Sequence, residues 1–259
     1  MTELFLFILG LIVGSFLNVC IYRVPQEQSV IWPGSSCPAC KQAIRWHDNI
    51  PLFSYLILKG KCRSCQDKIS FVYPVVELIS GCLWLFLWIK YGLSFEFAAG
   101  AVLCSVLLCL SVIDLQIGLI PDKITFPAMV LGLLLSMIAP VLHGEIVWYW
   151  GGLQSLIGLL TGGGILLLTA MIGSILFRKE AMGGGDIKLL AMIGAFVGWT
   201  DAVFVFFLAP ILSLPFALWA KFGSQKETIP FGPFLAMTGA AFYVFGNQIL
   251  EMISHLYGV

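Results

Sequence analysis

Two aspartates stand out in a chain that carries few charged residues. Only 11% of the 259 residues are charged and 59% are hydrophobic, whereas soluble domains carry about 25% charged residues. Asp114 ends one apolar stretch, in Ser-Val-Ile-Asp-Leu-Gln, and Asp186 opens another, in Gly-Gly-Gly-Asp-Ile-Lys. Because an ionisable side chain in or beside a membrane is costly, both aspartates call for a functional explanation.

Two carboxylates at close range suit the hydrolysis of a peptide bond. They share one proton, since both cannot ionise cheaply; the ionised one activates water and the other donates to the scissile carbonyl. The helix dipole predicts that Asp186, at a helix N-terminus, is the base and that Asp114 holds the proton. The glycines Gly183, Gly184 and Gly185 give a backbone that lets an extended substrate pass Asp186. A simple helix-breaking loop is the alternative reading of these glycines.

Four cysteines in one polar segment have the spacing of a metal site. They form two Cys-x2-Cys pairs, Cys37 with Cys40 and Cys62 with Cys65, and two such pairs complete a tetrahedral zinc site. Four protein ligands leave no position for water, so the ion would be structural. Two disulfides are the alternative, which a reducing cytoplasm disfavours. The segment 23–71 is too small to bury a core alone, and zinc would stabilise it. No convincing internal repeat is evident.

Long apolar stretches must position these groups. The mean hydropathy of +0.98 and the recurring stretches predict an all-α, polytopic membrane bundle of about eight transmembrane helices with a small zinc-bound cytoplasmic loop domain. The expected parts are a first transmembrane helix over 1–22, the loop domain over 23–71 and a peptidase core over 72–259. The apolar stretches are 4–22, 72–89, 97–113, 124–142, 152–177, 187–199, 202–220 and 231–250.

The charges predict the topology of this bundle. If loops are sorted by parity, every Lys and Arg except Lys90 lies on one side. The positive-inside rule makes that side cytoplasmic, with both termini outside and with Asp114 and Asp186 facing the cytoplasm. Because topology explains the basic residues, we expect no nucleic-acid partner.

Other polar residues have local interpretations. Asp122 follows Ile120-Pro121 and is predicted to cap the next helix. Glu77, in an apolar stretch, is predicted to line a polar cavity or to pair with a cation of the loop. His47 is predicted to be a surface residue. The sequence contains no nucleophile elbow, H-E-x-x-H or phosphate-binding loop.

Ordered motifs along nearly the whole chain resemble the type IV prepilin peptidases, also called leader peptidase/N-methyltransferases, which are intramembrane aspartyl proteases of the G-x-G-D type. The G-x-G-D motif alone is weak, whereas the ordered set is specific. The motifs are Gly-Ser-Phe-Leu-Asn-Val at 14–19, Tyr-Arg-Val-Pro at 22–25, the cysteine pairs, Tyr73-Pro74 with Glu77, 114–122, 181–190 and Ile-Pro-Phe-Gly-Pro-Phe at 229–234.

The resemblance implies an aspartic endopeptidase of the bacterial inner membrane. Such enzymes cut the leader from type IV prepilins or pseudopilins of pilus and type II secretion systems, and many methylate the new N-terminus with S-adenosylmethionine. Asp114 and Asp186 correspond to the family's catalytic aspartates. Gly60 and Lys61 fall at positions that the family associates with methylation, and Glu77 is expected to join them at the methyl-donor site. The oligomeric state stays open.

Three rival functions remain at this stage. One is a membrane peptidase of the same type without methyltransferase activity. Another is a proton-coupled membrane transporter in which Asp114, Asp186 and Glu77 form a relay, although transporters place such acids near the midplane. The third is a zinc-bearing assembly factor without enzymatic activity.

Overall fold

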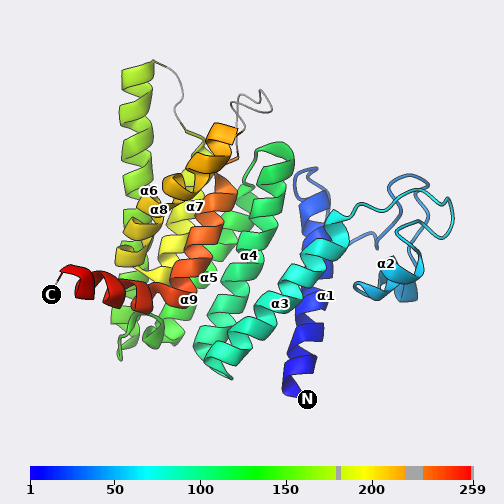
Figure 1. Cartoon of the computed structure of the whole chain (residues 1–259), viewed down its shortest axis with the longest axis horizontal. Coiled ribbons are helices and arrows are strands. Elements are labelled where there is room, and N and C mark those ends of the chain that lie inside the picture. The colour runs from blue at the N-terminus through cyan, green and yellow to red at the C-terminus, as the bar shows by residue number, and fades with distance from the viewer. Residues whose placement is uncertain (179–181, 220–229, 258–259) are drawn as a thin grey trace. The chain divides into compact units, whose positions relative to one another are not determined.

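The computed structural model describes residues 1–178, 182–219 and 230–257, and this part of the chain is helical and contains no strand (Figure 1). The predicted all-α class is therefore confirmed. A few predictions fall outside the described residues. These are the topology assignments of Lys179, Lys221 and Lys226, together with Ala181 and Ile229 of the family motifs.

The chain divides into two compact units, an N-terminal unit, Met1–Leu93, and a C-terminal unit, Ser94–Val259. The N-terminal unit contains α1 (Thr2–Arg23), the short 3-10 helix η1 (Trp46–Asn49), α2 (Phe53–Ile57) and α3 (Val72–Tyr91). The predicted division into three functional parts is a separate matter and stays a prediction.

Small residues bring α1 and α3 close together. A Cβ added to Gly10 would lie 2.8 Å from the Cα of Gly81, so a larger side chain would force the helices apart. Ser80 of α3 donates a hydrogen bond of 2.7 Å to the carbonyl oxygen of Gly10. Close packing of small residues with such a bond is typical of helices in a membrane.

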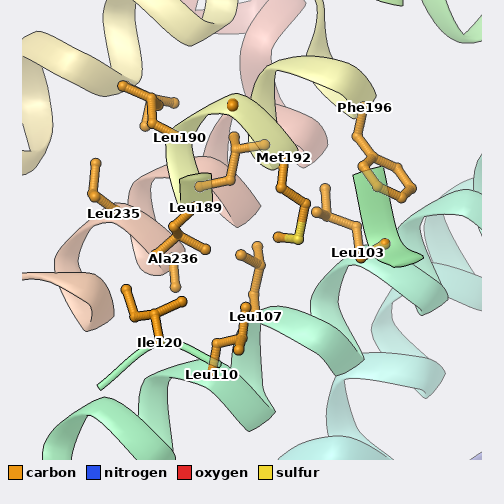
Figure 2. Packing of buried hydrophobic residues seen from close by; sticks show 14 of the residues in the cluster. Leu103, Leu107, Leu110, Ile120, Leu189, Leu190, Met192, Phe196, Leu235 and Ala236 are labelled. Carbon is orange, nitrogen blue, oxygen red and sulfur yellow. The ribbon is translucent and has the colours of Figure 1, made fainter. Parts of the chain in front are cut away.

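The C-terminal unit surrounds a short buried helix. That helix is α7 (Gly184–Val197), and it contacts helices both before and after it in the chain. Figure 2 shows Leu189 of α7 near Ala236, with Ile120 and Leu110 beyond it, all in one buried cluster. The other elements are α4 (Phe95–Ile117), α5 (Asp122–Ile138), η2 (Pro140–His143), α6 (Trp148–Phe177), α8 (Trp199–Trp219) and α9 (Gly232–Tyr257).

Five of the described helices, α1, α3, α4, α6 and α8, are long and apolar enough to cross a membrane. The protein is therefore polytopic. Each of the eight predicted stretches falls at least partly in a helix, but α5 and α7 are short, and the count of eight crossings stays a prediction. The predicted stretch 124–142 is too long, because α5 ends at Ile138 before Pro140 opens a 3-10 turn.

Candidate active site

Asp114 lies in the last turn of α4. This helix begins at a Ser94 cap, whose hydroxyl accepts a hydrogen bond of 3.1 Å from the Phe97 amide. It ends at Gly118, which adopts the left-handed region at φ 65° and donates to the Asp114 carbonyl oxygen at 2.8 Å. The helix therefore runs about one turn beyond Asp114 rather than ending there as expected. The Asp114 side chain is buried.

The carboxylate of Asp114 is held by the beginning of α9. The amide of Gly232 donates a hydrogen bond of 2.9 Å to Oδ2 of Asp114. A Cβ at Gly232 would lie only 2.6 Å from that oxygen, so the approach requires glycine. The α9 N-terminus thus faces Asp114 as the α7 N-terminus faces Asp186. The helix-dipole argument consequently does not separate the two carboxylates, and the assignment of the proton stays a prediction.

Sequence reasoning missed the role of Gly232. A signal was present. Gly232-Pro233 stands near the start of an apolar stretch that follows Pro230, and proline is common in the first turn of a helix. Such a start leaves a neighbouring backbone amide without an intrahelical partner. What the sequence does not give is the carboxylate that meets this amide.

Asp186 is the third residue of α7 and is half-buried. Among the preceding glycines, only Gly185 is tightly packed, because its added Cβ would lie 2.9 Å from Cβ of Ile120. Among the described residues, a Cβ on Gly184 would meet no atom within 4 Å, and one on Gly183 would lie 3.8 Å from Asp186 Oδ2. The described residues therefore leave the backbone of Gly183 and Gly184 uncrowded.

The two aspartates are brought together across α4 and α7. These helices are in contact. The side chain of Ile120 connects their surroundings. It lies against Gly185, the residue before Asp186, and against Gly232, whose amide binds Asp114. The sequence alone could not establish this proximity.

Asp122 does not cap α5, which corrects the expectation. Pro121 occupies the N-cap position, and no side chain makes a capping hydrogen bond there. Instead, both oxygens of Asp122 accept hydrogen bonds from Nζ of Lys188, at 2.7 and 2.8 Å. Lys188 lies two residues after Asp186, so this ion pair ties the first turns of α5 and α7 together.

The four predicted cysteines also meet. Their sulfur atoms all lie within 4.8 Å of one another, and those of Cys37 and Cys65 are 3.8 Å apart. Four thiolates at about 2.3 Å from a tetrahedral zinc ion would be about 3.8 Å apart, so the arrangement fits that ion. Hydrogen bonds from the backbone amides of Cys65 and Ser64 lower the pKa of the Cys62 thiol to about 7. This favours the thiolate that a metal requires at Cys62, whereas desolvation and the neighbouring cysteine thiols raise the pKa of Cys65 to about 12.

The cysteine pairs form two copies of one turn, a repeat that the sequence did not make evident. Lys41 donates to the Cys37 carbonyl oxygen at 2.9 Å, and Gln66 donates to that of Cys62 at 3.0 Å. Both donors have φ of 60°. The shared pattern Cys-x2-Cys-x3-Ile, ending at Ile44 in one copy and at Ile69 in the other, could have revealed the repeat.

A cavity of about 1010 Å³ lies within the N-terminal unit, and Glu77 lines it. The carboxylate of Glu77 is buried, and its Oε2 accepts a hydrogen bond of 2.9 Å from the Leu52 amide. In the described part of the chain no Lys or Arg forms an ion pair with it. Of the two alternatives predicted for Glu77, a polar cavity or a loop cation, the structure supports the cavity.

Gly60 and Lys61 are not among the residues that line this cavity. Gly60 adopts φ of +67° next to Tyr55, whose hydroxyl oxygen would lie 2.9 Å from an added Cβ. Lys61 forms an isolated bridge with Lys68 in the second cysteine turn. Both residues thus shape the turn that carries Cys62 rather than the wall of the cavity.

A polytopic helical membrane protein with two aspartates near the ends of contacting helices has the architecture expected of an intramembrane aspartyl peptidase. Comparisons with known proteins agree with this class. Residues 8–91 match the Bacterial Peptidase A24 N-terminal domain, and residues 101–218 match the Type IV leader peptidase family. No solved structure is significantly similar to the chain.

Three curated relatives have the name Prepilin leader peptidase/N-methyltransferase, and each is 34% identical to this chain. The protein of Burkholderia pseudomallei (strain 1026b) aligns over 96% of this chain and 87% of its own length. Those of Neisseria gonorrhoeae and Bacillus subtilis (strain 168) each align over 95% of this chain, and over 92% and 95% of their own lengths. The chain belongs to the prepilin leader peptidase/N-methyltransferase family.

Proposed function

We propose that this protein cleaves the leader from type IV prepilins or pseudopilins and then methylates the new N-terminus. The names of the relatives, together with identities of 34% over nearly the whole chain, support both activities. The single observation that carries the peptidase proposal is that the side chain of Ile120 lies against both Gly185, next to Asp186, and Gly232, whose amide binds the carboxylate of Asp114. Two carboxylates in this arrangement share one proton.

The proposed cleavage uses the pair as acid and base. One carboxylate accepts a proton from water as the oxygen attacks the scissile carbonyl, and the other donates its proton to the carbonyl oxygen. The proton held by the first carboxylate then passes to the leaving amine as the C–N bond breaks, and one hydroxyl of the tetrahedral intermediate returns a proton to the second carboxylate. The Gly232 amide fixes the orientation of Asp114 through its bond to Oδ2. The uncrowded backbone at Gly183 and Gly184 leaves room for the substrate strand beside Asp186.

For the second activity, we propose that the four cysteines hold a structural zinc ion and that S-adenosylmethionine binds in the cavity of the N-terminal unit. A volume of about 1010 Å³ reaches the upper end of the range of small-molecule pockets. Glu77 presents a buried carboxylate for donor recognition, with Tyr55 and Tyr73 in the same wall. When bound, the donor supplies an electrophilic methyl group. Gly60 and Lys61 would act by positioning the second cysteine turn.

The proposed location is the bacterial inner membrane, which the chain crosses several times. Five apolar helices and the family support a membrane protein. The charge sorting supports a cytoplasmic position for the aspartate pair and the cysteine loop, with both termini outside. Expected partners are the prepilin or pseudopilin substrates of a pilus or type II secretion system and the surrounding lipid.

Cleavage of a purified prepilin by detergent-solubilised variants tests the peptidase proposal. Asp114→Asn and Asp186→Asn should each lose about 10²- to 10⁴-fold in kcat, the range for a general acid or base. Glu96→Gln, at the other end of α4 from Asp114, is the matched control and should cleave normally. Normal turnover in either aspartate variant contradicts the proposed pair.

Methyl transfer from a labelled donor to an already cleaved pilin tests the second activity separately. Asp114→Asn should still methylate this substrate, whereas Glu77→Gln should lose methyl transfer and keep cleavage. Cys37→Ser should lose zinc and methylation together. Full methylation by Glu77→Gln would remove that carboxylate from the donor site.

A further inference from the structure

The short helix α2 exposes apolar side chains and buries a polar one. The side chains of Phe53, Leu56 and Ile57 are 63%, 71% and 72% exposed, whereas Ser54 is 7% exposed. Positions 53, 56 and 57 lie on one face of a helix. This polarity is the reverse of that in a helix on a soluble domain, where the apolar face is buried.

Polar contacts fix the orientation of α2. The Ser54 hydroxyl accepts a hydrogen bond of 3.0 Å from the Ile50 amide and donates one of 2.9 Å to the His47 carbonyl oxygen. Ser54 and Tyr55 line the cavity of the N-terminal unit, and Leu58 does so one turn later. One face of α2 is therefore a cavity wall, and the apolar face is held outward.

The position of α2 along α3 gives the depth of this apolar face. The amide of Leu52, next to α2, donates to Oε2 of Glu77 at 2.9 Å. Glu77 follows five residues after Val72, where α3 begins, which is about 7–8 Å along the helix axis at 1.5 Å per residue. Figure 1 shows α2 at a level between the two ends of α1 rather than beyond either end. Both α1 and α3 are candidate membrane spans.

The charge around α2 matches an anionic lipid surface. The segment 23–71 contains seven Lys and Arg against three Asp and Glu, a net charge of +4. Lys59 follows α2 and is exposed, and Trp46 of the neighbouring η1 is 82% exposed. Tryptophan is enriched at the membrane–water interface, and basic residues attract anionic headgroups.

We propose that α2 docks into the boundary between headgroups and acyl chains of an anionic bilayer. Phe53, Leu56 and Ile57 enter this boundary, while Trp46 and Lys59 lie at the headgroups. An interfacial helix buries its apolar face about 5–10 Å below the headgroup surface, which agrees with the depth along α3. The bilayer thereby stabilises the position of α2, and with it the cavity wall that α2 forms.

Site-specific photo-crosslinking in lipid nanodiscs tests the proposal on the full chain. Benzoylphenylalanine replaces Leu56 on the outward face, and a matched variant carries it in place of Tyr55 on the cavity face. After illumination, mass spectrometry separates lipid adducts from protein adducts. We expect position 56, and not position 55, to form lipid adducts, with a higher yield when phosphatidylglycerol is added to phosphatidylcholine.

Other occupants of the apolar face give different products. Adducts of position 56 with the C-terminal unit, or with a second copy of the chain, would overturn the proposal, as would the absence of lipid adducts. Equal lipid labelling at positions 55 and 56 would contradict the fixed orientation of α2. Lys59→Gln should reduce the effect of phosphatidylglycerol on the yield. None of these readouts depends on peptidase or methyltransferase activity.

Discussion

A methyl group on Gly232 would enter the space of the Asp114 carboxylate, and Gly232→Ala therefore tests how closely that carboxylate must be held. The added Cβ would lie 2.6 Å from Oδ2, whereas ordinary contacts begin at 3.4 Å. The carboxylate must then move by about the difference, 0.8 Å, or α9 must retreat by the same amount. Either movement lengthens the hydrogen bond of 2.9 Å that orients Asp114.

The size of the effect follows from this displacement. A misplacement of about 1 Å in a catalytic constellation costs on the order of 10²-fold in rate. A shift of about 0.8 Å should accordingly lower kcat by roughly 10- to 100-fold, which corresponds to about 1.4–2.7 kcal/mol of transition-state stabilisation. Alanine has a higher helix propensity than glycine by about 1 kcal/mol, which opposes any loss of stability.

Gly239→Ala in the same helix is the matched control. The three atoms nearest to its added Cβ would be side-chain atoms of Ile193, at 2.9 to 3.1 Å, so it strains the core near Ile193 rather than at Asp114. We expect this variant to melt at a lower temperature and to cleave prepilin at close to the wild-type kcat. Thermal melting and steady-state cleavage measure both effects.

Two outcomes would refute this reasoning. If folded Gly232→Ala cleaves at the wild-type kcat, the amide contact does not position the carboxylate for catalysis. If both variants lose the same activity in proportion to their stability, the effect is one of packing. Methyl transfer to an already cleaved pilin should be normal in both variants, because the proposed donor site lies in the N-terminal unit, and thermal melting shows whether each variant is folded.

Three more predictions concern ion pairs and the cysteine cluster. Lys188→Met should lower kcat about tenfold by releasing the first turn of α7. The free energy of unfolding should change by only about 0–1 kcal/mol, because the ion pair is exposed. Exchanging the charges of Lys188 and Asp122 should restore most of the kcat in a cleavage assay. Cys40→Ser should remove the zinc measured by elemental analysis, and full zinc content would contradict the four-cysteine site. The hydrogen bond from Arg63 lowers the pKa of Asp48, so this pair stabilises the loop above the ordinary Asp pKa and loses that effect as pH falls through the lowered value. In limited proteolysis, Arg63→Met should be cut faster than wild type at neutral pH, and the difference should vanish in acid.

The reactive groups of this chain could be read from its sequence because their identity alone makes them unusual. An aspartate in an apolar stretch and two Cys-x2-Cys pairs each have few explanations. Hydropathy located the helices for the same reason, since a span needs a long apolar segment. These features depend on residues that are neighbours in the chain.

The supports of the site could not be read in this way, because they join distant segments. The Gly232 amide meets a carboxylate that is 118 residues earlier, and Lys188 meets one that is 66 residues earlier. Local sequence rules predicted that Asp122 caps α5. Pro121 occupies the N-cap position instead, and the Asp122 carboxylate accepts hydrogen bonds from Lys188. The cysteine turns repeat in backbone geometry while their intervening residues differ, which hid the repeat.

The two cysteine turns also affect the conformational entropy of the chain between them. They hold the ends of the chain between Cys40 and Cys62 close together, with η1 and α2 inside the closed ring. Closing a flexible ring of about 20 residues costs about 2.7 kcal/mol of chain entropy, and a cross-linking ion removes that cost in advance. An ion bound by the four cysteines would therefore restrict the movement of α2 away from the cavity, although none of the four ligands belongs to that helix.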